Sequence, residues 1–284
     1  MTRIPLWMKL LRWYALHSPV VRGTYRVATM LYPRLAIPNS EVVTTLDGDL
    51  QITLRLPNWV DFNMYCLGFY ERPLAHYFLG ALTARSVVLD VGAYIGQYTL
   101  LAARHAPQGH VVAFEPHPES YQRLEAHVAR NKLTNVRILQ QAAGAQAGHM
   151  SFALARTASC SGLLPPGSAA PHVAEVAVTT IDQVVQQLNV PRVDLIKIDV
   201  EGAVGQVLHG AQATLTRDHP LLIVEVSREL ERDVDDTPEA IFALLRQLQY
   251  KCYCLRWRGV VSMLVPIQEA SVRHENIIAI PTVT

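Results

Sequence analysis

The sequence has little charge and few cysteines, and each shortage excludes a class of protein. Only 17% of its 284 residues are charged while 50% are hydrophobic, which is too apolar a composition for a disordered chain. A formal net charge of +1 excludes a broadly basic coat for nucleic acid. The length suits one large domain, or one domain with an extension.

The cysteines lack the spacing of a metal site or a redox pair. The four residues, Cys66, Cys160, Cys252 and Cys254, fit neither a zinc knuckle nor a C-x-x-C motif. Cys252 and Cys254 alternate along a predicted strand, so both side chains would face one side of a sheet. We therefore expect reduced, buried thiols and a cytoplasmic protein.

Two further absences concern membranes and the first part of the chain. No uninterrupted apolar run approaches the ~18–20 residues that cross a bilayer, and no small-residue cleavage site follows a clean apolar stretch. We therefore expect neither a membrane span nor a secretory signal. Residues 1–40 contain no Asp or Glu but six cations, namely Arg3, Lys9, Arg12, Arg22, Arg26 and Arg34. The remaining residues carry 19 basic and 24 acidic side chains, a net charge of −5.

Two helices are predicted near the start of the chain, over residues 4–16 and Val20–Leu31. Two interpretations of residues 1–32 stay open. In the first, the helices cap the main domain. In the second, they form a cationic amphipathic arm that makes peripheral contact with an anionic membrane or a lipid-linked substrate.

A hairpin is predicted next, with strands at Glu41–Leu46 and Leu50–Leu56 around the turn dipeptide Asp47-Gly48. The composition changes soon after this hairpin. We therefore divide the chain into a helical arm and hairpin extension over residues 1–60 and a main domain over residues 61–284.

From residue 86 onward, short apolar runs alternate with helical periodicity. The runs are Ser86–Val91, His110–Glu115, Val136–Gln140, Val193–Asp199, Leu221–Val226, Lys251–Trp257 and Asn276–Ile280. This alternation predicts a parallel sheet with helices on both faces. Residues 155–172 interrupt it with a loop rich in Ser, Gly and Pro, which is either a lid near a site or an idle insertion.

The first of three strand ends with notable residues is Asp90-Val91-Gly92-Ala93-Tyr94-Ile95-Gly96. Open α/β sheets bind ligands at the carboxyl ends of their strands. The G-x-x-x-G spacing lets a ligand approach the backbone, and the amides of the following helix start point toward it. The motif is neither the G-x-G-x-x-G of dinucleotide folds nor a P-loop. Strand–helix packing is the alternative role of the two glycines.

The second and third strand ends supply carboxylates. Glu115, in Phe114-Glu115-Pro116, follows Asp90 by 25 residues, where an acid can accept both hydroxyl hydrogens of a ribose. The alternative is an acid that stabilises a helix start. Asp199 and Glu201 follow the fourth strand, where such a pair can hold a cation, orient a hydroxyl or act as a base. A helix cap is the alternative.

Together these segments resemble the class I S-adenosylmethionine-dependent methyltransferases, and more narrowly the FkbM-type family. The resemblance runs in order over about residues 65–281 and rests on Gly68–Glu71, Val88–Gly96, Ala113–Pro118, Val193–Ala203, Val207–Ala211 and Asn276–Pro281. It implies a Rossmann-like α/β sheet of seven mostly parallel strands with helices on both faces. It also implies O-methylation of a hydroxyl on a sugar, a glycan or glycolipid, or a polyketide-type small molecule.

The resemblance further implies where S-adenosylmethionine binds. The family's cofactor loop corresponds to Asp90, Gly92 and Gly96, and its ribose acid corresponds to Glu115. Tyr70 and Glu71 are expected to close over the cofactor. The other residues expected around it are Tyr94, Pro116, Ala142 and Asp199.

Two positions depart from the family pattern. Tyr94 stands where the family usually has Asn, and Ala145 stands where it usually has an acid after Ala142-Ala143-Gly144. The first departure affects contacts to the methionine end of the cofactor, and the second affects a polar contact on the adenine side. Glu115 is retained, so we expect cofactor binding to survive.

A sugar or aliphatic hydroxyl is a poor nucleophile at neutral pH, so we expect a base near it. Asp199 or Glu201 is the leading candidate by position, followed by Glu225 at the end of the fifth strand. His209 is the third candidate, with a place on a helix surface as its alternative. A divalent cation beside Asp199 is a further hypothesis, but no His-rich ligand set accompanies it and we assign no metal ligands.

Two rival hypotheses remain. One is another nucleotide-dependent Rossmann enzyme, for NAD or a nucleotide sugar, which would need a phosphate cradle that the motifs lack. The other is a cofactor-binding but non-catalytic methyltransferase-like scaffold, which Tyr94 and Ala145 make conceivable. We expect no nucleic-acid partner, because the main domain has no basic groove signature and no base clamp. The acceptor and the oligomeric state stay open.

Overall fold

The structure is a computed structural model that describes residues 4–17, 30, 32, 37, 39–153, 162–163, 173–228, 234–258, 261–269 and 272–282. Apart from Met30, the helix expected at Val20–Leu31 lies outside the described residues. So do Cys160 and, apart from Gly162-Leu163, the loop expected at 155–172. Within the described ranges, every helix is too short or too polar to cross a bilayer.

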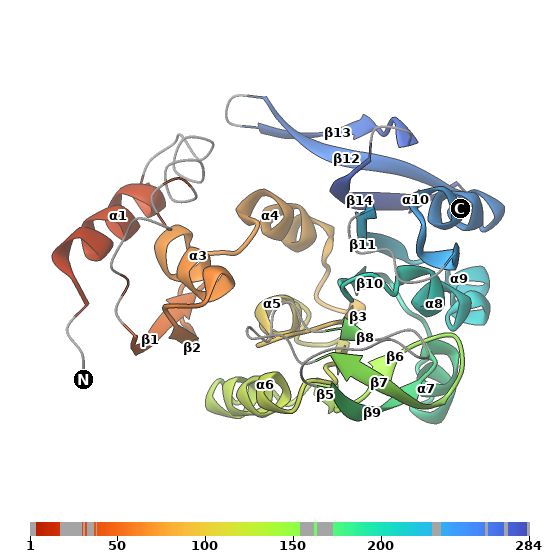
Figure 1. Ribbon diagram of the computed structural model, residues 1–284, viewed down its shortest axis with the longest axis horizontal. Coiled ribbons are helices and arrows are strands. Elements are labelled where there is room, and N and C mark those ends of the chain that lie inside the picture. Colours follow the sequence, from red (N-terminus) through yellow and green to blue (C-terminus); the bar gives the residue numbers. More distant parts are fainter. Residues whose placement is uncertain are drawn as a thin grey trace.

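The main sheet contains eight strands in the order β13-β12-β14-β11-β10-β3-β4-β5 (Figure 1). They are β3 (Val87–Val91), β4 (His110–Phe114), β5 (Val136–Leu139), β10 (Leu195–Ile198), β11 (Leu221–Ser227), β12 (Tyr250–Arg258), β13 (Val261–Pro266) and β14 (His274–Pro281). Strands β5, β4, β3, β10 and β11 pair in parallel, and the other three pair antiparallel. Seven strands match the predicted apolar runs, and β13 adds an eighth because a hairpin returns the chain onto β12.

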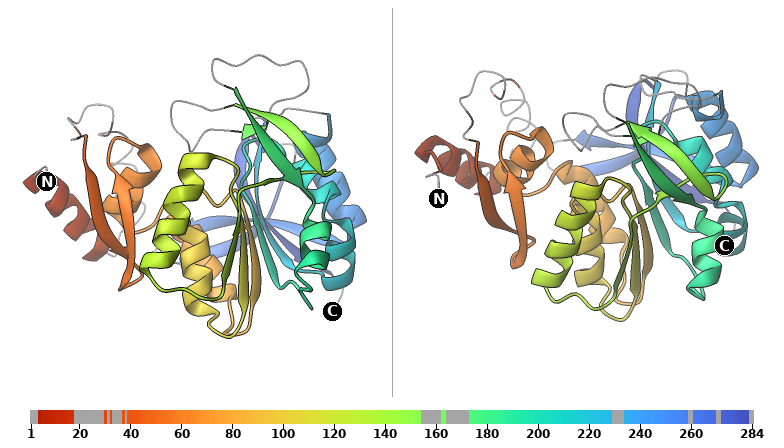
Figure 2. Two further views of the ribbon diagram at one scale, coloured as in Figure 1. Left: turned by 90° about the horizontal axis from the view of Figure 1, so that it is seen from below. Right: turned by 60° about the horizontal axis from the view of Figure 1, so that its bottom comes forward.

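The central strands are buried because helices cover both faces of the sheet, and every residue of β3 is buried. One face packs against α4 (Arg72–Ala81), α5 (Gln97–His105) and α6 (Pro118–Arg130). The other face packs against α7 (Ile181–Gln187), α8 (Val204–His209), α9 (Gln212–Asp218) and α10 (Pro238–Gln247), which the short 3₁₀ helix η4 (Val234–Asp236) precedes (Figure 2). The α/β class that the sequence predicts is therefore confirmed.

A second, four-stranded sheet lies beside the main one and was not predicted. Its order is β6-β9-β7-β8, formed by β6 (Ala142–Ala143), β7 (Gly148–Ala153), β8 (Gly162–Leu163) and β9 (Val173–Thr179). Strands β7 and β9 lie on either side of the interruption that the sequence showed at 155–172, and β8 lies within it. Phe152, from β7, reaches the cavity described below.

The first part of the chain contains the predicted first helix and hairpin, followed by one more helix. It contains α1 (Leu6–His17), the hairpin of β1 (Glu41–Leu46) and β2 (Leu50–Arg55), and α3 (Trp59–Leu67). Helix α3 packs on both α1 and β2. The predicted boundary between residues 60 and 61 falls inside α3, whose start is fixed because the Asn58 side chain accepts hydrogen bonds from the backbone N–H groups of Val60 and Asp61.

Gly92 lies where the end of β3 meets the end of β10, and there is no room for a side chain there. Its φ is +83°, and a Cβ would lie 1.8 Å from the carbonyl oxygen of Asp199. We expect Gly92→Ala to lower the free energy of unfolding by about 2–3 kcal/mol, because it combines a left-handed backbone with a backbone clash. Urea unfolding measures this change.

Gly80, in α4, is the matched control for Gly92. A Cβ at Gly80 would meet no heavy atom within 4 Å. In a helix, alanine is favoured over glycine by up to about 1 kcal/mol, so Gly80→Ala is expected to leave stability unchanged or raise it. Equal unfolding midpoints for the two variants would contradict the close approach of β3 and β10.

Candidate active site

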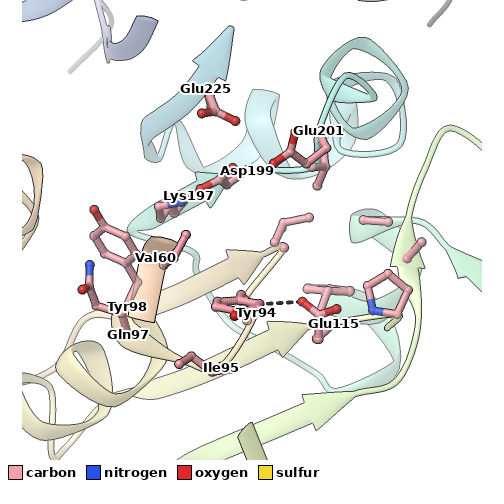
Figure 3. A pocket seen from close by; sticks show the side chains of 18 of the residues that line it. Val60, Tyr94, Ile95, Gln97, Tyr98, Glu115, Lys197, Asp199, Glu201 and Glu225 are labelled. Atoms are coloured by element: carbon pink, nitrogen blue, oxygen red, sulfur yellow. Dashed lines mark hydrogen bonds and ion pairs between the residues drawn. The ribbon is translucent and has the colours of Figure 1, made fainter. Parts of the chain in front are cut away.

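One cavity lies at the carboxyl ends of the parallel strands, where the sequence places its three motifs (Figure 3). The turn after β3, residues 92–95, forms one wall, and Phe114–Pro116 after β4 forms the next. Residues 141–143 and 199–201 complete the lining at the ends of β5 and β10. The topology therefore gathers motifs that are about 100 residues apart in the chain.

The glycine turn holds its backbone in a conformation that glycine favours. Gly92 and Gly96 have φ values of +83° and +95°, and Gly96 directly precedes α5. The backbone N–H groups of Gly92 and Ala93 both donate to the carbonyl oxygen of Phe114, at 3.0 Å. Gly92 lines the cavity, whereas Gly96 packs behind it, where a Cβ would lie 2.3 Å from the Leu124 side chain.

Glu115 projects into the cavity and is already held by two backbone groups. Its Oε2 accepts from the N–H of Tyr94 at 2.6 Å, and its Oε1 accepts from the N–H of His117 at 2.8 Å. Burial raises the pKa of Glu115 to about 8, even though both hydrogen bonds favour the ionised form. Each carboxylate oxygen has a second lone pair, so two ribose hydroxyls can still donate to this side chain.

Tyr94 directs its hydroxyl away from Glu115 and into the extension. The hydroxyl donates to Oδ1 of Asp61, in α3, at 3.0 Å. The other oxygen of Asp61 accepts from the Arg123 guanidinium at 2.6 Å and from the N–H of Arg55 at 2.7 Å. The buried Asp61 carboxylate thus anchors Tyr94, whose φ of +50° is strained for tyrosine. In this way it connects the glycine turn to the extension.

We expect Tyr94→Phe to lower the free energy of unfolding by about 1–2 kcal/mol, because Asp61 loses one donor in a site closed to water. Thermal unfolding measures the change. Tyr121→Phe is the control, since its hydroxyl bonds to Glu125 on an exposed surface. Equal effects of the two variants would show that the Asp61 contact does not hold the loop.

A buried ion pair forms the opposite wall of the cavity. Lys197 is 2% exposed, and its Nζ donates to Oδ2 of Asp199 at 2.6 Å. The same ammonium lies 4.6 Å from the centre of the Tyr98 ring. Burial acts to raise the pKa of Asp199, but the Lys197 charge, together with hydrogen bonds from Glu225 and Lys197 and the charge of His274, outweighs burial, and the pKa lies below its usual range. Asp199 is therefore a paired carboxylate that binds a proton weakly.

Glu225, at the end of β11, differs from Asp199 in its affinity for a proton. Burial and the neighbouring Asp199 charge raise its pKa to about 8, and its side chain hydrogen-bonds to that of Asp199. Nε2 of His274 lies 3.2 Å from its Oε1, and this contact raises the pKa of His274. Glu225 is thus a cavity carboxyl group that can gain or lose a proton near neutral pH, and unlike Glu115 it lies beside Asp199.

The remaining expected residues fall into two groups. Tyr70, Pro116, Ala142 and Glu201 line the cavity. Glu71, Asp90 and His209 make other contacts. Glu71 accepts from the Asn276 side chain at 2.7 Å, and burial raises its pKa to about 7. Asp90 is buried behind the cavity wall and accepts from the Thr99 hydroxyl at 2.6 Å.

His209 lies on α8, half-exposed and 3.9 Å from Asp235, outside the cavity lining. The apolar face of α8 packs on the sheet, and the end of the helix carries His209 away from the strand ends. Its alternative, a residue on the helix surface, is therefore what the structure shows.

Several residues of the site carry no role in the sequence interpretation. Lys197 precedes Asp199 by two positions, so the strand period already placed both on one side. Gln97 and Tyr98 open α5, and Gln97 exchanges hydrogen bonds with the backbone of Tyr70 at 2.7 and 2.9 Å. Phe152 comes from the unpredicted sheet, and no local signal could have identified it.

The fold and the cavity thus define an α/β protein that carries hydrogen-bond acceptors for a nucleoside at the ends of its strands. The Methyltransferase FkbM domain matches residues 90–252, more than half of the sequence. The chain belongs to the FkbM methyltransferase family, as the resemblance implied.

Known proteins that the chain is similar to are distant. It is 28% identical over 198 residues to the AMB antimetabolite synthetase AmbE of Pseudomonas aeruginosa, covering 57% of this chain and 9% of that protein. The FkbM methyltransferase of Methylobacillus flagellatus has a TM-score of 0.48 at 16% identity, with 77% and 52% of the two chains covered. TYW2 of M. jannaschii, in complex with AdoMet, has a TM-score of 0.44 at 14% identity, with 86% of each chain covered. The chain thus spans less than a tenth of the synthetase and about half of the FkbM structure.

The residues of the cavity fit S-adenosylmethionine. Four carboxyl groups line it, those of Glu115, Asp199, Glu201 and Glu225, against one Lys or Arg among the described residues. Carboxyl oxygens accept hydrogen bonds from ribose hydroxyls, and the carboxyl groups that ionise attract a sulfonium cation. The buried hydroxyl of Tyr98 also lines the cavity and has no hydrogen-bond partner within the described part of the chain, so it is available to a ligand.

A divalent cation has no comparable support. The described residues contain no group of three or more His, Cys, Asp or Glu side chains arranged to hold a metal ion. The carboxylates near Asp199 are instead matched with Lys197 and His274.

Proposed function

We propose that this enzyme methylates a hydroxyl oxygen of a sugar, a glycan or glycolipid, or a polyketide-type small molecule, with Glu225 as the general base. The observation that carries the proposal is the place of Glu225 in the cavity wall beside Asp199, where burial raises the pKa of Glu225 to about 8 while the pKa of Asp199 lies below its usual range. A base with a pKa near the working pH removes a hydroxyl proton most effectively.

S-adenosylmethionine supplies an electrophilic methyl carbon and leaves as a neutral thioether. The chain's own residues then have three tasks. Glu115 holds the ribose, and the cavity walls exclude water from the reacting atoms. Glu225 takes the proton of the acceptor hydroxyl as the oxygen bonds to the methyl carbon. The neighbouring ion pair of Asp199 and Lys197 stays charged throughout.

The acceptor class has two supports. Apolar side chains of Val60, Met64 and Phe152 line the cavity beside the carboxyl groups, which suits a ligand with both hydroxyl and hydrocarbon parts. The relative AmbE is a synthetase of an antimetabolite, which favours a small-molecule product.

The free thiols of Cys66, Cys252 and Cys254 support a cytoplasmic location.

We expect Glu225→Gln to lower kcat by about 100-fold, at the low end of the effect of a general base. Its affinity for S-adenosylhomocysteine should stay within a factor of about two, because Glu225 faces the acceptor side in this proposal. An acceptor screen with isotope-labelled methyl donor comes first, using sugars, lipid-linked glycans, polyketide-type alcohols and their amine analogues. The kinetics then use the acceptor found.

Asp199→Asn separates the two carboxyl groups. If Glu225 is the base, the pH–rate profile of Asp199→Asn keeps the limb on which kcat rises with pH, whereas the profile of Glu225→Gln loses it. Methylation of the amine analogues alone would overturn the hydroxyl assignment. Full turnover by Glu225→Gln would overturn the base.

A further inference from the structure

Helix α1 has apolar side chains on two opposite faces, and the fold uses one of them. Met8 and Ala15 are fully buried in the core that α1 shares with α3. The opposite face carries Leu6, Leu10, Trp13 and Tyr14, which are 71, 58, 62 and 53% exposed. Positions i, i+4, i+7 and i+8 form one stripe along a helix. We call these four residues the bare face of α1.

The bare face concentrates the exposed apolar surface of the molecule. Of the ten large hydrophobic residues that are exposed in the described part of the chain, five lie on α1, namely these four and Leu16. Single exposed hydrophobic residues are ordinary on a protein surface, whereas a contiguous stripe marks an interaction site.

The bare face is not needed to hold α1 in place. On its other side, the Arg12 guanidinium donates to the carbonyl oxygen of Tyr65. The Arg72 guanidinium donates to the carbonyl oxygen of Ala15 at 2.9 Å, from α4. Figures 1 and 2 show α1 at the end of the molecule opposite to β12, so its outer side can lie against a flat surface.

Charge identifies what covers this face. The first 40 residues carry six cations and no carboxylate, whereas the rest of the chain has a net charge of −5. Lys9, on α1, is exposed beside the stripe. A homodimer through this face would bring Lys9 of both copies to the interface, and like charges there are unfavourable. An anionic surface attracts this end and repels the remainder, which also fixes an orientation.

We propose that the bare face of α1 lies on the surface of a bilayer that contains anionic lipids. Trp13 and Tyr14 are the residue types that prefer the membrane interface, since each has an apolar ring and a polar group. The apolar stripe enters the headgroup boundary and the cations contact lipid phosphates. This surface contact does not depend on the identity of the methyl acceptor.

Co-sedimentation with vesicles tests the proposal. The full chain is expected to bind phosphatidylcholine vesicles that contain phosphatidylserine, to bind them less at high salt, and to bind pure phosphatidylcholine weakly. The double variant Leu10→Glu/Trp13→Glu should lose at least about 100-fold in vesicle affinity, because two apolar side chains that would enter the headgroup boundary are replaced by carboxylates.

Met263→Glu is the matched control, since it replaces a residue that is 47% exposed on β13, far from α1. It should bind vesicles as the natural chain does. Both proteins should keep their Tm and their affinity for S-adenosylhomocysteine, which shows that the fold is intact. Unchanged vesicle binding by the double variant would overturn the proposal. So would a dimer in solution that the double variant converts to monomer, because a second copy would then cover the face.

Discussion

Glu115→Gln is expected to weaken the binding of S-adenosylhomocysteine by about 10²–10⁴-fold at pH 8, because two hydrogen bonds to a charged carboxylate each contribute about 1.5–3 kcal/mol. The glutamine amide keeps the size of the side chain, but its NH₂ group cannot accept from a ribose hydroxyl. Calorimetric titration measures the loss. Glu175→Gln, an exposed change on β9, is the control and should bind as the natural chain does.

The pH dependence of binding provides a second test of Glu115. Its pKa is about 8 in the free protein, so binding of the ribose hydroxyls to the carboxylate requires loss of a proton below that pH. Affinity should therefore rise as the pH rises toward 8 and level off above it. Glu115→Gln should abolish this part of the slope. A natural chain with pH-independent affinity from pH 6 to pH 9 would contradict the assignment.

The same carboxyl group makes an opposite contribution to stability. The folded protein holds the proton of Glu115 up to about pH 8, while the unfolded chain releases it near 4.5, the ordinary pKa of glutamate. The unfolded chain therefore binds fewer protons between these values, and stability falls as the pH rises through this window. From pH 5 to pH 8.5 the Tm of the ligand-free natural chain should therefore fall more steeply than the Tm of Glu115→Gln, which has no proton to lose at this position. Equal slopes for the two proteins would contradict the raised pKa of Glu115.

Lys197→Met is expected to lower the free energy of unfolding by about 3–5 kcal/mol, because removal of one partner leaves a buried charge uncompensated. Burial acts to lower the pKa of Lys197, but Asp199 and Asp90 outweigh it, and the pKa lies above its usual range. The ammonium is therefore charged, and several carboxylates attract it at once. Urea unfolding at pH 7 measures the change.

A double-mutant cycle separates the charge from the packing of Lys197. The variant Lys197→Met/Asp199→Asn removes both charges, and it should recover most of the stability that Lys197→Met loses. Lys251→Met, at an exposed position of β12, is the control and should change stability by less than about 0.5 kcal/mol. Additive losses in the double variant would show that the two side chains do not act as a pair.

The sequence predicted the parallel strands and the motifs at their ends because both depend on local patterns. Apolar runs that alternate with helical periods indicate buried strands, and the topology then brings Gly92, Glu115 and Asp199 to one edge without further information. The main sheet, the hairpin of β1 and β2, and the glycine turn after β3 followed from these rules.

Contacts between distant segments could not be predicted in this way. Asp61 precedes Tyr94 by 33 residues, and no spacing rule connects a helix in the extension with the cofactor loop. The sheet of β6 to β9 is formed by short strands around an interruption. Strands this short leave only a weak periodic signal in the sequence. The different protonation of Asp199 and Glu225 depends on which of them contacts Lys197, and only the packed structure shows that contact.

A crystal structure of the full chain with S-adenosylhomocysteine tests the account most directly. It should show both ribose hydroxyls within hydrogen-bond distance of Glu115, and the sulfur facing the wall formed by Asp199 and Glu225. Density for the ligand at another place, or a cavity that the Tyr94 ring closes to it, would contradict the assignment of this site.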